Sequence, residues 1–134
     1  MNGRERAIAA FVQAAPVLGA AVWVLLLVTH QNDYAFMFVL FMPGLVMLAT
    51  ALAVALVAVI VAPRGFVRTQ AAGSLRFHSI VGAVSVVLLV LAFAALARGA
   101  MAAAQSMVML FGVLLPIVEI GRALMYGIAA ARGK

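Results

Sequence analysis

Long apolar stretches alternate with short polar ones along this chain. Because an isolated backbone in hydrocarbon must satisfy its own hydrogen bonds, an apolar run of about 20 residues is typical of a membrane-crossing α-helix. The pattern therefore predicts an all-α integral membrane protein, a single domain over residues 1–134 with four transmembrane helices. The expected spans are about 7–29, 35–62, 80–97 and 106–130.

The polar segments between these runs indicate how the helices connect. Segments 29–34 and 98–105 are short, which favours antiparallel neighbours, whereas 63–79 is longer and contains basic residues and no acid. We therefore expect two antiparallel helical hairpins joined by a basic cytoplasmic link at 63–79. The arginines of this link are Arg64, Arg68 and Arg76.

When the four expected spans cross the membrane in turn, most cations fall on one side of it. Lys and Arg near the ends of spans are retained on the cytoplasmic side during insertion. Arg98 lies on the opposite side and Arg122 within a span, so the bias predicts cytoplasmic amino and carboxyl ends (N-in, C-in) in a bacterial-type inner or plasma membrane. The cations on the cytoplasmic side are Arg4, Arg6, Arg64, Arg68, Arg76, Arg132 and Lys134.

The composition places most of the chain in lipid. Hydrophobic residues make up 69% and charged residues 9%, and the mean hydropathy is +1.28, values that exclude a water-soluble surface. Cysteine is absent, which excludes disulfides and thiolate chemistry. The net charge of +6 comes from cations spread singly between apolar runs. We therefore expect contact with membrane lipid and with other subunits or other copies, and no nucleic acid.

Prolines inside the apolar runs predict helix kinks. Pro43 and Gly44 lie within the run 35–62, which at roughly 28 residues is longer than a bilayer requires. A kinked and tilted helix is the favoured interpretation, and an interfacial segment at 34–42 before a shorter span is the alternative. Pro116 is expected to kink the last helix and to free a carbonyl there.

Glu119 and Arg122 are the ionisable residues expected deepest in the membrane. Placing each of these side chains near the bilayer centre costs about 2.5 to 3.5 kcal/mol on insertion scales, so a favourable contact should offset the cost. Three residues apart on a helix, they share a face and are expected to pair with each other. The favoured hypothesis is a structural ion pair, with Arg122 reaching towards the interface. The alternative is a proton- or cation-coupling site in which Glu119 changes charge.

Histidine and methionine do not form an expected metal or haem site. His30 and His78 fall at opposite ends of the spans, separated by roughly the 30 Å of the hydrocarbon core, and His78 is expected among the headgroups. Met37, Met42 and Met47 are five apart, so they do not share a helix face on which to bind copper. No metal and no cofactor are expected.

Small residues mark the expected helix contacts and helix ends. Ala15 with Gly19, and Ala51 with Ala55, are four apart, a spacing that allows close packing in lipid. An arginine followed by glycine closes three apolar runs, as expected where a cation meets the last carbonyls and glycine takes a left-handed turn. These pairs are 64–65, 98–99 and 132–133.

No arrangement of residues indicates catalysis. The only acids are Glu5, Asp33 and Glu119, and no nucleophile, base and orienting group occur together. We therefore expect a protein that is not an enzyme and that acts as an accessory, assembly or regulatory subunit of a larger membrane complex. The alternative is a small oligomeric transporter or channel built around Glu119 and Arg122. A lytic pore-former is a third interpretation.

Overall fold

The computed structural model describes residues 2–29 and 43–134, which form four α-helices and no strand. Each helix is long and apolar enough to cross a membrane, so the fold is all-helical and consistent with a multi-pass membrane protein. The helices are α1 (Gly3–Thr29), α3 (Pro43–Val61), α4 (Phe66–Ala97) and α5 (Met101–Ala131).

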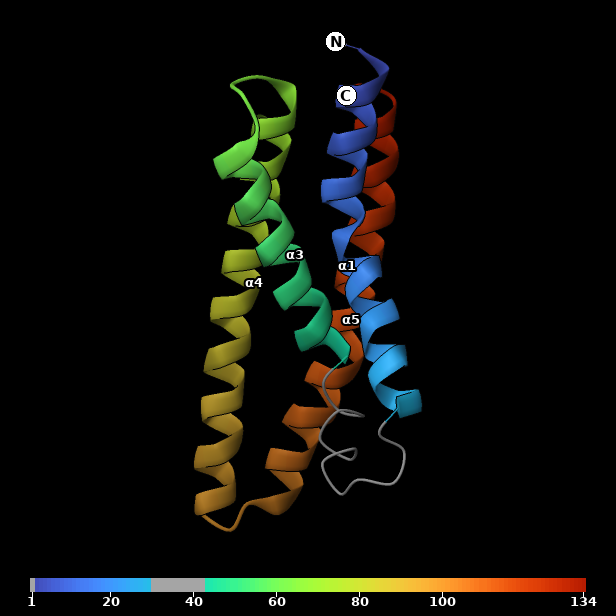
Figure 1. The fold of residues 1–134 in the computed structure, drawn as a ribbon. Helices are drawn as coiled ribbons and strands as arrows, with labels where there is room; N and C mark the ends of the chain where they lie inside the picture. The colour runs from blue at the N-terminus through green and yellow to red at the C-terminus, as the bar shows by residue number, and fades with distance from the viewer. Residues whose placement is uncertain (1, 30–42) are drawn as a thin grey trace.

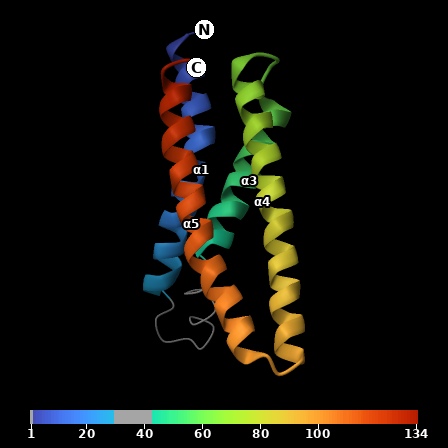
Figure 2. The same ribbon diagram turned by 180° about the vertical axis from the view of Figure 1, so that it is seen from behind.

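Both chain ends and the α3–α4 connection lie at the same end of the bundle, which we call the terminal end, and the α4–α5 connection lies at the other end (Figure 1). At the terminal end α1 lies beside α5 and α3 lies beside α4, as the view from behind also shows (Figure 2). Each described helix contacts the other three. The described helices therefore form one bundle.

Helix α4 starts well before the apolar run that predicted it. It begins at Phe66, so most of the expected link 63–79 is helical, and only 62–65 connect α3 to α4. Its 32 residues span about 48 Å, more than the roughly 30 Å of a hydrocarbon core. The link differs from the expectation because polar residues that continue a helix beyond the bilayer resemble a solvated loop in composition.

The first and last helices also begin earlier than their apolar runs. α5 begins at Met101 rather than near residue 106. α1 begins at Gly3 rather than near residue 7, and a reciprocal capping box explains its start. The Glu5 N–H donates to Asn2 Oδ1 (2.8 Å), and the Asn2 N–H donates to Glu5 Oε2 (3.0 Å).

Two of the three expected arginine–glycine helix ends are confirmed. Gly99 and Gly133 have positive φ angles of 75° and 78° and follow the last turns of α4 and α5. The Gly99 N–H donates to Leu96 O (3.0 Å) and the Ala100 N–H to Ala95 O (2.9 Å), the two bonds of a Schellman motif. Gly65 instead precedes α4, with φ 147°.

The predicted close packing of small residues joins α1 to α3. Ala15, Ala51 and Ala55 are fully buried. A Cβ atom on Gly19 would lie 2.5 Å from the Cα of Met47. Only glycine lets the two backbones approach this closely, so Gly19 sets the spacing of these helices.

The expected kinks involve Pro116 and Pro43. Pro116 lies near the middle of α5, and the axis of α5 changes direction near its middle in both views (Figures 1 and 2). Pro43 is the first described residue of α3, so the expected arm 35–42 lies outside the described residues. A Cβ on Gly44 would lie 2.7 Å from the Leu115 side chain, so Gly44 brings α3 against α5.

The same substitution at two glycines tests this packing. Gly19→Ala should lower the free energy of unfolding by about 1 to 3 kcal/mol, because the new methyl overpacks the contact with α3. Gly121→Ala is the matched control, since nothing lies within 4 Å of its Cβ position. The control should leave stability unchanged or slightly raised, as measured by denaturant titration in micelles. Equal effects of the two substitutions would contradict the close approach.

Candidate functional site

A histidine and a glutamate meet in the interior between α4 and α5. His78 Nε2 lies 2.8 Å from Glu119 Oε2, and the side chains are 1% and 0% exposed. Each residue lies roughly 18 Å along its helix from the terminal end. The two helices therefore bring an acid and a base together inside the bundle.

The contacts of the imidazole ring indicate where its protons lie. His78 Nδ1 is 2.7 Å from the backbone carbonyl oxygen of Ser74, and a carbonyl oxygen only accepts, so Nδ1–H is the donor. The contact between His78 Nε2 and Glu119 Oε2 then holds a single proton. Whether that proton is on nitrogen or on oxygen, the pair is neutral overall, which suits a fully buried site.

Arg122 lies between two aromatic rings. Its guanidinium carbon is 4.1 Å from the centre of the Phe77 ring and 4.4 Å from that of Tyr126. Arg122 Nη2 also donates to Gln13 Oε1 on α1, at 3.4 Å. Cation–π contacts are worth about 0.5 to 2 kcal/mol, depending on how far the cation is desolvated, so the rings offset part of the cost of this partly buried charge.

The expected direct ion pair between Glu119 and Arg122 does not form. The carboxylate of Glu119 faces α4 and contacts His78, whereas Arg122 contacts Phe77 and Tyr126. Sharing a helix face is not sufficient for pairing when a neighbouring helix offers each side chain a closer partner.

Two glutamines extend the polar contacts towards the terminal end. Gln13 Nε2 donates to the backbone oxygen of Gln70 (3.0 Å) and to its Oε1 (3.1 Å). Gln70 Nε2 donates in turn to the backbone oxygen of Lys134 (3.1 Å). Gln13 is buried although it lies on an apolar helix. These bonds connect α1, α4 and the end of the chain, and we call the whole set the polar network.

The sequence interpretation missed His78 as the partner of Glu119. His78 was expected among headgroups, but it is fully buried, because α4 already runs alongside α5 at this depth. A signal was present: Gln70, Ser74 and His78 recur every fourth residue, which places them on one helix face. Interpreting 63–79 as a link concealed that periodicity.

Two buried polar atoms in the polar network remain without a hydrogen-bond partner among the described residues. They are Glu119 Oε1 and Arg122 Nε. The described residues contain no group of three or more His, Cys, Asp or Glu side chains that could hold a metal ion. The site therefore offers a proton held between two groups and a cation on aromatic faces.

The remaining predicted residues lie elsewhere. Arg64, in the α3–α4 connection, and Arg68 and Arg76, on the first three turns of α4, are exposed and line a surface groove. Met47 is buried against α1, whereas His30, Met37 and Met42 lie outside the described residues. The three arginines are thus exposed, whereas Ser74 and His78 on α4 are buried.

The four long apolar helices fit the class of multi-pass helical membrane proteins. Known protein-family models, curated proteins and solved structures contain no match to this chain.

A double-mutant cycle tests the pair. His78→Leu and Glu119→Leu should each lower the free energy of unfolding by about 3 to 5 kcal/mol, because each leaves a buried ionisable group alone. The double variant should lose clearly less than the sum of the two. Ser106→Ala, which removes an exposed hydroxyl contact within α5, is the control and should be nearly neutral. Strictly additive losses in micelle unfolding would show that the two side chains do not interact.

Proposed function

We propose that this chain is a small multi-pass membrane protein that acts as an accessory, assembly or regulatory subunit of a larger membrane complex. The observation that carries the proposal is the enclosure of its interior ionisable pair. His78 and Glu119 are fully buried against each other. Neither of them lines the two surface hollows that lie beside the α3–α4 connection. The polar network supports a role in holding the helices together, which leaves the outer surface for function.

The outer surface offers helix faces to lipid and to partner helices. Among residues 80–97 of α4, only Ser85 and Ala92 are buried. Large apolar side chains on the same helix are exposed, including Val87, Val90 and Phe93. In lipid, such a surface is suited to packing against the helices of another subunit.

The proposed arrangement is two antiparallel hairpins with both ends in the cytoplasm. The two chain ends, which carry cations in the sequence, lie at the same end of the bundle as the α3–α4 connection, which contains Arg64 (Figure 1). Arg98 belongs to the opposite, α4–α5 connection. This asymmetry supports an inward-facing terminal end in a bacterial-type inner or plasma membrane.

Reporter fusions test the topology. A phosphatase that is active only outside the cytoplasm should be inactive when fused after Lys134 and active when inserted after Gly99. A fluorescent protein that folds only in the cytoplasm should give the opposite pattern. An active phosphatase at the carboxyl end would overturn the proposed orientation.

Purification from the native membrane tests the subunit role. The chain, tagged at its amino end through a flexible linker and extracted in mild detergent, should retain one or more other membrane proteins in stoichiometric amounts. Glu119→Gln should retain the same partners, because an amide N–H can still donate to His78 Nε2 and preserve the bundle. An equally tagged, unrelated membrane protein is the control. A homogeneous complex of this chain alone would contradict the proposal.

The alternative is an oligomeric transporter or channel, in which Glu119 carries charge. Its support is the buried Glu119 Oε1, which has no hydrogen-bond partner among the described residues. In this alternative the single proton between His78 and Glu119 is exchanged during transport. A complex formed only of this chain, in the purification above, would favour it.

A further inference from the structure

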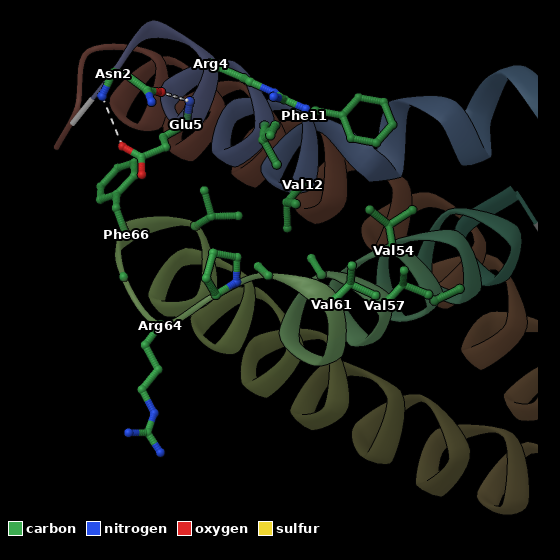
Figure 3. A pocket seen from close by; sticks show the side chains of 17 residues that line it. Asn2, Arg4, Glu5, Phe11, Val12, Val54, Val57, Val61, Arg64 and Phe66 are labelled. Carbon is green, nitrogen blue, oxygen red and sulfur yellow. Dashed lines mark hydrogen bonds between the residues drawn. The ribbon is translucent and has the colours of Figure 1, made fainter.

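Two hollows lie beside the α3–α4 connection at the terminal end, and they share Arg64 and Gly65. The first, which we call the apolar cavity, has a volume of about 800 Å³ and lies between the start of α1, the end of α3 and the start of α4 (Figure 3). Its lining is mainly aliphatic and aromatic, and includes Ile8, Phe11, Val12, Val54, Val57 and Val61.

The second hollow, which we call the arginine groove, has a volume of about 490 Å³. Arg64, Arg68 and Arg76 line it, and its remaining lining residues are small: Gly65, Thr69, Ala72 and Gly73. No acid lines the groove. Guanidinium groups bind phosphate oxygens through charge-assisted hydrogen bonds, so this lining is suited to a phosphate.

The apolar cavity extends along the membrane-spanning part of α3. Its lining runs from Val61, the last residue of α3, back to Ala53, which is about 12 Å along the helix axis. An apolar cavity of this length, next to a bilayer, is suited to binding a hydrocarbon chain. Glu5, the acid in its lining, accepts the capping hydrogen bond of Asn2, and Arg4 lies beside it in sequence.

The geometry points to one anionic phospholipid bound across both hollows. We propose that its phosphate contacts Arg64 and Arg68 in the arginine groove, that Arg76, about 12 Å further along α4, adds positive charge to the same groove, and that part of an acyl chain fills the apolar cavity. Figure 3 shows the Arg64 side chain extending away from the apolar side chains of the cavity. Arg64 thus lies between a site suited to hydrocarbon and a site suited to phosphate. A phospholipid has the same arrangement, with an acyl chain next to a phosphate.

This inference goes beyond the subunit role and does not depend on a protein partner. It requires only that the chain is embedded in a membrane. Lipid binding and partner binding are therefore tested separately, and either can be found without the other.

Native mass spectrometry of the delipidated full chain, with added phosphatidylglycerol or phosphatidylcholine, tests the proposal. The wild-type chain should retain one phosphatidylglycerol in preference to phosphatidylcholine. The combined variant Arg64→Gln, Arg68→Gln and Arg76→Gln should weaken retention by roughly a hundredfold. Arg98→Gln, at the opposite end of the bundle, is the charge control and should retain the lipid as the wild type does.

A second pair of variants tests the apolar cavity. Val57→Trp should weaken retention, because Val57 lines the cavity and the larger ring occupies it. Val113→Trp is the matched control, since the two valines are 58% and 59% exposed and Val113 lies outside the cavity. Circular dichroism confirms that each variant is folded.

Three results would overturn the proposal. The first is equal retention of phosphatidylcholine and phosphatidylglycerol. The second is unchanged retention by the triple arginine variant. The third is full competition by glycerol phosphate at the concentration of the lipid, since a headgroup that binds equally well without acyl chains has no need of the cavity.

Discussion

A charged side chain inside a membrane bundle requires a partner that offsets the cost of burying it, and the contact between His78 and Glu119 meets this requirement for both residues. The pair shares one proton and is neutral in either form, and the Ser74 carbonyl holds the imidazole in position. It connects α4 to α5 inside the bundle. Arg122 and Gln13 then add α1 to the same region. The packing of three helices therefore depends on a small number of polar contacts, because side chains in lipid gain little from hydrophobic burial against one another.

The hydrophobic pattern was sufficient to predict four helices, and small residues four apart were sufficient to predict close packing faces on them, though not which helices meet there. Both signals are local: one is a run length and the other a spacing along one helix. Glu119 and Arg122 were also recognisable, because any charge within an apolar run is conspicuous. Their partners were not, since the identity of a neighbour on another helix depends on tertiary packing. His78 was missed for a further reason. A polar composition alone does not show whether a segment is a loop or the part of a helix that extends beyond the bilayer. The period of four in Gln70, Ser74 and His78 is the observation that makes this distinction.

The interior and the surface of the bundle have different roles in this account. Inside, the polar network and the close contact at Gly19 hold the helices in one arrangement. Outside, the helices present apolar faces to lipid and to other helices, and the terminal end presents arginines beside an apolar cavity. In the proposed subunit role, the protein would act through what it contacts in the membrane. The proposed phospholipid would occupy exposed surfaces of α1, α3 and α4, which do not include the buried ionisable pair.

The most direct test of this account is a flux assay on the purified chain in sealed liposomes, with an imposed pH gradient and a pH-sensitive dye inside. If the buried pair is structural, the wild-type chain and the Glu119→Gln variant should both release the gradient no faster than liposomes without protein. A wild-type flux above that background, lost in Glu119→Gln and retained in the surface control Arg98→Gln, would contradict the account and make Glu119 a transport residue.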